Sequence, residues 1–260
     1  ESQDIHGSPT PAGLIAGGSG RLETQAACPF MGFAIYRLGL PQPADARDLL
    51  DTKERGTLLH WILEKVYSLA PNSDQAKSLA EDSLESICAE ALKRHGHLPE
   101  AFAESEKIRL IDLVRDWLAL EADRDAFDVV ETERRHTVSL GDWQLQLRID
   151  RLDKVGNDLV VIDYKTGKAS SAAALSKQMT APQLPLYSLI RDDIAGVYYA
   201  QLKHDDQKII GVGNKNPQLV AAKHRQMKTT EPDNSWAAQR AEWRGELMNL
   251  AVQIGAGDAR

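Results

Sequence analysis

A two-residue turn between two strand-like runs constrains this chain more than any other feature of its sequence. Gly156 and Asn157 follow the alternating run Trp143 to Val155 and precede the apolar run Leu159 to Lys165. A Gly-Asn pair between such runs is typical of a tight β-hairpin. Because a further strand-like run, Asp128 to Leu140, comes just before, the sequence predicts three strands in meander order.

The turn also predicts which side chains of the hairpin lie together. If Val155 pairs with Asp158, the continued register places Asp150 directly opposite Asp163. Opposed side chains share one face of a sheet, with Cβ atoms ~5 Å apart. Two carboxylates are therefore expected side by side on neighbouring strands.

Side chains alternate between the two faces of a strand, and this alternation predicts which charged residues share a face with the two aspartates. Lys165 shares the face of Asp163, whereas Arg151 and Asp153 point to the opposite face. Adjacent buried carboxylates need a cation, and hard oxygen ligands favour Mg²⁺ or Mn²⁺. The alternative is that Lys165 neutralises one of the aspartates as a structural ion pair.

The rest of the chain is predicted to supply helices around a mixed sheet. Helical periodicity covers Arg21 to Leu38, with an interruption at Cys28-Pro29, and then Gly56 to Leu69, Ser73 to Arg94, Glu100 to Asp123, Ser170 to Ile190 and Ser235 to Leu250. Further strands are expected at Ile194 to Leu202 and Lys208 to Val212. We therefore expect an α/β fold with a mixed β-sheet flanked by helices.

The expected domain organisation is simple. Residues 1–19 are rich in Gly, Ser and Pro and are predicted to form a flexible leader. Residues 20–260 are predicted to form one domain, with a helical lobe at about 56–125 inserted before an α/β core at about 127–250.

The net charge of the chain limits how it can bind nucleic acid. A net charge of -7 argues against a protein that coats nucleic acid through bulk electrostatics, so any phosphate-binding surface must be local. One segment has a local basic excess, which either tracks a DNA backbone or is an exposed surface without a partner. Its basic residues are Lys203, Lys208, Lys215, Lys223, Arg225 and Lys228.

Two further observations concern the location of the protein. The cysteines, Cys28 and Cys88, are too few for a disulfide framework or a four-ligand metal site, which fits a reducing compartment. No apolar run approaches the ~18 residues that a membrane-spanning helix requires, and no secretory signal is present in the sequence. We expect a cytoplasmic protein without membrane contact.

Three motifs in order point to a known family. They are Gly56-Thr57-Leu58-Leu59-His60 followed by Glu64, the stretch Val160 to Gly167, and Gln183-Leu184-Pro185-Leu186-Tyr187. Together they resemble the RecB-type branch of the PD-(D/E)XK nuclease superfamily, in which a helix-borne His, an Asp ending a "GxxD"-like strand, a "DYK" strand and a "QxxxY" helix recur. Here Leu147-Arg148-Ile149-Asp150 lacks the usual glycine but keeps the aspartate.

The resemblance implies a restriction-endonuclease-like fold and a set of site residues. By this likeness, the metal ligands are His60, Asp150, Asp163 and the backbone carbonyl of Tyr164, Lys165 positions or activates the attacking water, and Gln183 and Tyr187 support the site and the DNA. For His60 alone, the alternative is a histidine near a helix N-terminus that is satisfied by its neighbours.

The resemblance also implies an activity and partners. The segments Arg21 to Phe30 and Arg55 to Glu64 look like those of bacterial predicted DNA-repair proteins related to AddB-type helicase-nuclease subunits. We therefore expect an Mg²⁺- or Mn²⁺-dependent deoxyribonuclease, an exonuclease rather than an endonuclease. It would be the C-terminal nuclease module of a DNA repair or recombination protein, acting on DNA beside a helicase-like domain or subunit. The alternatives are a catalytically silent DNA-binding or scaffold module, and a hydrolase of another phosphate ester.

Two kinds of residue receive a more ordinary interpretation. In many relatives a cysteine at the position of Cys28 helps to hold an iron-sulfur cluster, but this chain has no matching cysteine triplet, so no cluster is predicted within it. Cys28 and Cys88 then serve as small buried residues. Trp61, Trp117 and Trp143 are expected in the core rather than as base-stacking platforms.

Overall fold

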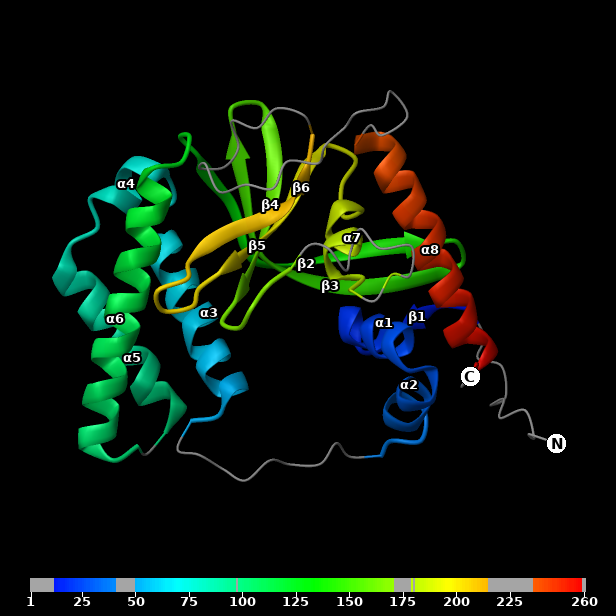
Figure 1. The fold of residues 1–260 in the computed structure, drawn as a ribbon, viewed down its shortest axis with the longest axis horizontal. Helices are drawn as coiled ribbons and strands as arrows, with labels where there is room; N and C mark the ends of the chain where they lie inside the picture. The colour runs from blue at the N-terminus through cyan, green and yellow to red at the C-terminus, as the bar shows by residue number, and fades with distance from the viewer. Residues whose placement is uncertain are drawn as a thin grey trace.

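One mixed sheet organises the protein (Figure 1). The computed structural model describes residues 12–40, 50–96, 98–170, 179, 181–214 and 236–258. The strands are β1 (Leu14–Ile15), β2 (Asp128–Leu140), β3 (Trp143–Val155), β4 (Asp158–Lys165), β5 (Ile194–Gln201) and β6 (Lys208–Gly213). They lie in the order β1-β3-β4-β5-β6, with β2 paired to β3. The pairs β1–β3 and β4–β5 are parallel and the others antiparallel, so the predicted mixed sheet is confirmed.

The predicted hairpin register is confirmed. Val155 pairs with Asp158, and the same register continues to Arg151 opposite Ile162. Gly156 has a φ of 60°, a left-handed conformation that glycine adopts without steric cost. The turn residues therefore set the alignment of β3 and β4, as expected from the sequence.

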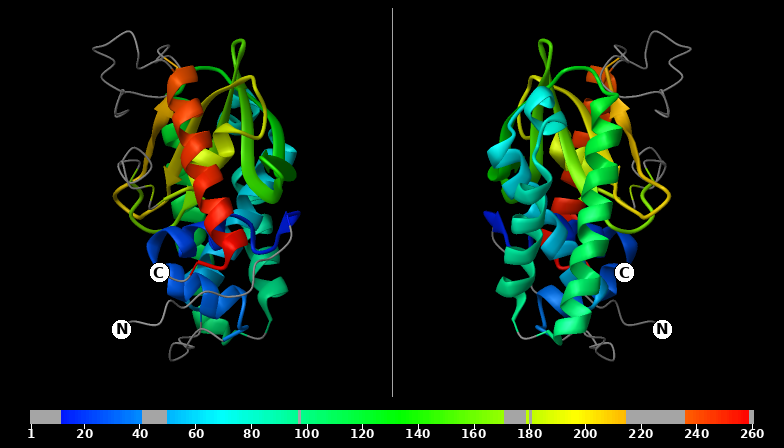
Figure 2. Two further views of the ribbon diagram at one scale, coloured as in Figure 1. Left: turned by 90° about the vertical axis from the view of Figure 1, so that its right-hand side faces the viewer. Right: turned by 90° about the vertical axis from the view of Figure 1, so that its left-hand side faces the viewer.

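Helices cover both faces of the sheet. One face carries α3 (Thr52–Leu69), α4 (Ser73–Lys77), α5 (Glu81–His95) and α6 (Glu100–Ala122), which form the helical lobe. The other side carries α1 (Gly18–Ala27), α2 (Pro29–Tyr36), α7 (Gln183–Ser188) and α8 (Trp236–Ala256), as Figure 2 shows from both ends. Alternation along β4 divides its side chains between two cores: Val160 and Ile162 pack with the helical lobe, and Val161 packs with α7 and α8.

Local hydrogen bonds explain why two helices differ from their predicted bounds. α3 begins at Thr52, before the predicted Gly56, because Asp51 and Glu54 form a capping box with N–H to carboxylate distances of 2.7 and 2.8 Å. The predicted helix Ser73 to Arg94 is broken into α4 and α5. At the break, the Ser78 hydroxyl donates to the Asp74 carbonyl, an interaction that competes with helix continuation.

A proline and a free strand edge explain two further differences between the predicted and the observed elements. The predicted helix Ser170 to Ile190 is, within the described residues, only α7, since Pro182 disfavours helical geometry at the residue before it. Residues 171–178 and 180 lie outside the described part. The predicted leader, 1–19, is wrong for its last residues, because Leu14–Ile15 pairs with the edge of β3 and α1 starts at Gly18. Residues 1–11 are not among those described.

A buried ionic cluster joins the helical lobe to the back of β3. Arg151 is fully buried and donates to Asp153 at 2.6 and 2.7 Å and to Glu121 of α6 at 2.6 Å. Arg124 contacts the same two carboxylates, and the Arg151 guanidinium carbon lies 4.0 Å from the centroid of the Tyr67 ring. The prediction that Arg151 and Asp153 face away from Asp150 is confirmed. Two cations and two anions balance within this buried volume.

The cluster predicts a large loss of stability when one partner is removed. Arg151→Leu leaves two buried carboxylates with a single cation, and we expect the free energy of unfolding to fall by about 3–5 kcal/mol. Urea denaturation followed by circular dichroism measures this change. Arg191→Leu, which breaks an exposed pair with Asp193, is the matched control and should cost less than about 1 kcal/mol. Equal losses in the two variants would contradict the assignment.

Candidate active site

Two buried aspartates meet where the pairing of β3 and β4 ends. Asp150 and Asp163 lie one step beyond the last registered pair, Arg151 and Ile162. They are 6% and 1% exposed. Asp150 Oδ2 accepts a 2.8 Å hydrogen bond from the backbone N–H of Tyr164, so a carboxylate takes the place of a strand carbonyl. Asp150 and Asp163, which the sequence predicted to share one face, therefore lie where the β3–β4 pairing ends and the two strands separate.

The helical lobe contributes a histidine to the same place. His60 Nε2 lies 3.1 Å from the carbonyl oxygen of Tyr164, and its Nδ1 lies 3.4 Å from Asp150 Oδ1. His60 is on α3, whose apolar residues Leu59, Ile62 and Leu63 are buried in the lobe and fix the orientation of the helix. Three of the predicted ligand groups are therefore adjacent.

Asp163 is enclosed by polar side chains. Its Oδ1 accepts hydrogen bonds from Gln183 Nε2 at 2.7 Å and from the Tyr187 hydroxyl at 3.0 Å. Its Oδ2 lies 2.7 Å from Lys165 Nζ, and Lys165 also donates to Gln183 Oε1 at 2.7 Å. All four side chains predicted for this part of the site come together. The geometry fits both a lysine held ready for chemistry and a structural ion pair.

Glu133 of β2 is a site residue that our sequence reasoning missed. Its neighbours Thr132 and Arg134 pair with Arg151 and Ile149, which places Glu133 beside Asp150. Its φ of 49° is unusual for a residue with a side chain, and such strain concentrates at functional sites. The turn Gly141-Asp142 between β2 and β3 gives the same register from the sequence, so the signal was present.

The donor set fits a hard divalent cation. Potential ligand atoms of His60, Glu133 and Asp150 all lie within 4.8 Å of one another. Both carboxylate oxygens of Glu133, and Oδ2 of Asp163, are buried without a hydrogen bond of good geometry. The nearest described cations are Arg148 Nε, 2.9 Å from Glu133, and Lys165. The separation of 3.4 Å between His60 Nδ1 and Asp150 Oδ1 approaches the ~3 Å edge of an octahedron with ~2.1 Å bonds.

The local electrostatics show how crowded the carboxylates are. Burial, followed by repulsion from Asp150, raises the pKa of Asp163 to about 7. Burial lowers the pKa of His60, but the neighbouring carboxylates of Asp150 and Glu133 outweigh this effect and raise it to about 10. In the metal-free protein these groups retain protons that a bound cation must displace, so metal affinity should increase with pH.

The site opens into a pocket of about 340 Å³ (lined by Lys53, Gly56, Thr57, His60, Trp61, Glu64, Glu133 and Arg148). Arg148 is 61% exposed at its rim. Lys203 and Lys208, the two described basic residues of the segment predicted from the sequence, do not line this pocket. Lys203 lines a separate pocket and Lys208 pairs with Asp206 at 2.7 Å, and the other four basic residues lie outside the described part of the chain.

The cysteines and tryptophans are distributed as follows. Cys28 is the N-cap residue of α2 and Cys88 is buried in the helical lobe, and neither forms a disulfide. Trp117 is fully buried, as predicted. Trp61 and Trp143 are only partly buried. None of the described helices combines the length and the apolar character of a membrane span.

Comparison with family models identifies a match. The family model described as the PD-(D/E)XK nuclease superfamily matches residues 19–260, nearly the whole chain. A search of curated proteins found no match.

The raised pKa of Asp163 predicts that the site reduces stability. The folded state holds this proton up to pH about 7, whereas the unfolded chain releases it near its ordinary value. Stability in chelator should therefore fall as pH rises from about 4 to 7, by up to about 1.4 kcal/mol per pH unit. Asp163→Asn should remove this slope and melt above the native protein at pH 8. Thermal unfolding across pH measures it, with Asp158→Asn on the same strand as control; an unchanged slope in Asp163→Asn would refute the assignment.

Proposed function

The chain belongs to the PD-(D/E)XK nuclease superfamily, and from this premise we propose that it is a metal-dependent nuclease that hydrolyses phosphodiester bonds in DNA. Its restriction-endonuclease-like fold brings β2, β3 and β4 together beneath α3. The observation that supports the proposal best is the meeting of two buried carboxylates, the partly buried carboxylate of Glu133, a histidine and a lysine at one end of these strands.

We assign the metal ligands to the atoms that converge there. His60, Glu133, Asp150, Asp163 and the carbonyl of Tyr164 would hold Mg²⁺ or Mn²⁺, since hard carboxylate and carbonyl oxygens suit both ions. Such an ion lowers the pKa of a water molecule and offsets the charge that accumulates on phosphate oxygens. Gln183 and Tyr187 hold Asp163 in place by donating to its Oδ1.

Lys165 is the residue to which we assign water activation and charge stabilisation. Its side chain is 35% exposed and its Nζ is held between Asp163 and Gln183, so it can donate to a group that enters the site. A positioned cation and hydrogen-bond donor stabilises the charge that develops on a phosphate during in-line attack. Arg148, at the rim, supplies a local positive charge on a chain whose net charge is -7.

The wider role is proposed from the resemblance of the motifs. We assign the chain to the nuclease module of a bacterial DNA repair or recombination protein, with exonuclease activity and a helicase-like domain or subunit as partner. The rival is a silent nuclease-like module that binds DNA or scaffolds a partner. The retention of Asp150, Asp163 and Lys165 in one network supports catalysis, because binding alone does not require that combination.

Lys165→Ala separates catalysis from a structural ion pair. We expect Mn²⁺-dependent cleavage of end-labelled DNA to fall at least ~100-fold, because a positioned donor to the transition state is lost. Mn²⁺ affinity, measured by isothermal titration, should not fall, since Lys165 is not a ligand. Lys154→Ala, an exposed lysine on β3, should cleave like the native chain. Full activity in Lys165→Ala would restrict that residue to a structural role.

Glu133→Gln tests the ligand that the fold revealed. Loss of one anionic ligand should weaken Mn²⁺ binding about 10-fold or more, and the cleavage rate should recover partly at high Mn²⁺ concentration. Glu131→Gln, on the same strand, is the matched control because Glu131 pairs with His136 rather than with the site. Native metal affinity in Glu133→Gln would remove this residue from the ligand set. Linear and circular substrates compared in the same assay decide between exonuclease and endonuclease cleavage.

A further inference from the structure

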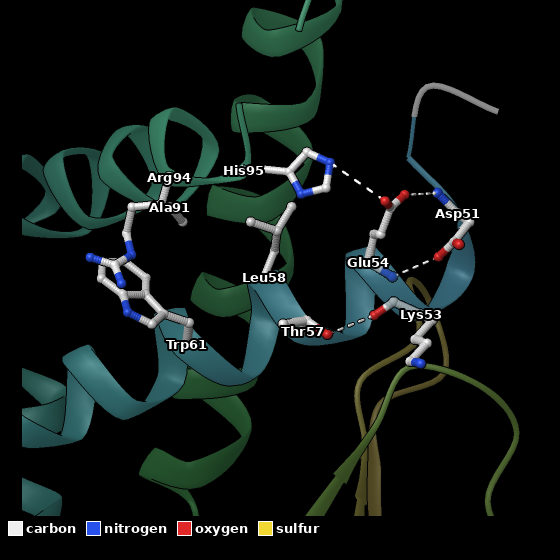
Figure 3. Close-up of a pocket in the computed structure, with 9 residues that line it drawn as sticks. All are labelled: Asp51, Lys53, Glu54, Thr57, Leu58, Trp61, Ala91, Arg94 and His95. Carbon is white, nitrogen blue, oxygen red and sulfur yellow. Dashed lines mark hydrogen bonds and ion pairs between the residues drawn. The ribbon is translucent and has the colours of Figure 1, made fainter. Parts of the chain in front are cut away.

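A second pocket, which Figure 3 shows, adjoins the active-site pocket along α3. It measures about 520 Å³ and is lined by Asp51, Lys53, Glu54, Thr57, Leu58, Trp61, Ala91, Arg94 and His95. Lys53, Thr57 and Trp61 line both pockets, so the two form one groove. We call this the α3 groove. It runs from His60 and Glu133 towards the end of α5.

Helical geometry explains why one side of α3 forms the floor of this groove. Lys53, Thr57 and Trp61 are four residues apart in succession, and such residues lie on one face of a helix. Seven residues separate Lys53 from His60, which corresponds to ~10 Å along the axis at ~1.5 Å per residue. A stacked strand carries a phosphate every ~3.4 Å. The groove therefore spans roughly three nucleotides beyond the metal site.

The groove combines the flat ring of Trp61 with the cationic side chains of Lys53 and Arg94. The Arg94 guanidinium carbon lies 5.1 Å from the Trp61 ring centroid, and Lys65 Nζ lies 5.4 Å from it. Neither Lys53 nor Arg94 has an ion pair with another described residue. Both planar groups, indole and guanidinium, stack on nucleobases, and the free charges complement phosphates.

The acidic residues at the far end of the groove are already engaged. Asp51 and Glu54 bind each other's backbone N–H groups in the capping box at 2.7 and 2.8 Å. The Glu54 carboxylate also lies 3.8 Å from His95 Nε2, as the dashed lines in Figure 3 show. Their charge is thereby partly offset, whereas Lys53 and Arg94 remain available to an anion.

Trp61 differs from a core tryptophan in its surroundings. Trp117 is fully buried, and its indole N–H donates to the Tyr67 hydroxyl at 2.8 Å. Trp61 packs against the lobe with one part of its ring and lines the groove with the rest. The sequence-based assignment of Trp61 to the core is therefore incomplete.

We propose that the α3 groove binds a single strand of DNA, with a base stacked on the Trp61–Arg94 pair and the backbone phosphates near Lys53. This inference rests on the proposed nuclease function, because the strand would leave the metal site along the groove. A single strand is required because the bases of a duplex are already stacked on one another, so none is free to lie against Trp61. The groove thus assigns single-stranded DNA as the substrate form.

Binding without cleavage tests this proposal. The Lys165→Ala chain in chelator would be titrated with fluorescent 12-nucleotide oligo-dT, with an abasic strand of equal charge and with a duplex. Trp61→Leu in this background should weaken oligo-dT binding about 5- to 100-fold, the range for one stacked base, and leave abasic-strand binding unchanged. Trp61→Phe should retain most of the affinity. Arg94→Met should lower affinity for both strands and reduce the salt dependence by about one charge.

The controls separate stacking from folding and from catalysis. Trp236→Leu, on α8, should bind like its parent, and melting curves show whether Trp61→Leu is folded. Oligo-dT binding that is unchanged in Trp61→Leu and Trp61→Phe, an equal loss for the abasic strand, or Trp61-dependent binding of duplex would each overturn the proposal. Hydrolysis of bis(p-nitrophenyl) phosphate by the native chain with Mn²⁺ tests the metal site alone. Its absence would count against the nuclease, while the binding result would still decide the groove.

Discussion

Carboxylates that are buried together repel each other, and the arrangement of this protein around Asp150 and Asp163 follows from that repulsion. Each available interaction offsets part of the excess negative charge: Tyr164 donates its backbone N–H to Asp150, His60 lies against Asp150 and Glu133, and Lys165, Gln183 and Tyr187 surround Asp163. The pKa of Asp163 is still raised to about 7, so the compensation is incomplete without a cation. A bound cation would complete the compensation, and under the proposed function the same cation would be the one that catalysis requires.

The same strands carry a second ionic cluster that is complete by itself. Arg151 and Asp153 alternate with Asp150 along β3, and together with Glu121 and Arg124 they balance two cations against two anions behind the site. The two clusters are separated by the thickness of one sheet, because neighbouring residues of a strand point to opposite faces. The balanced cluster fixes α6 to β3, and the incomplete cluster faces the pocket.

The helical lobe connects these features to the α3 groove. α3 places His60 over the ends of β3 and β4, and the same helix carries Lys53, Thr57 and Trp61 along the groove. Under the proposed function, one helix would align a metal ligand with the binding surface, so that a strand in the groove would reach the metal in a fixed register. A chain with a net charge of -7 would then bind a polyanion through a few local cations, of which Lys53, Arg94 and Arg148 line the two pockets.

The sequence by itself determined the sheet, the register of β3 and β4, and the grouping of Asp150, Asp163 and Lys165, because a Gly-Asn turn and strict alternation are local rules. It also gave His60, Gln183 and Tyr187, through motifs. It did not determine the start of α3, the break between α4 and α5, or the pairing of Leu14–Ile15 with β3, since these depend on specific side-chain bonds and on a free strand edge. The register of the Gly141-Asp142 turn placed Glu133 beside Asp150, but only the tertiary structure brought it to His60 of α3. The groove beside Trp61 was likewise decided by tertiary structure, because it arises where α3 packs against α5, and no local periodicity records that contact.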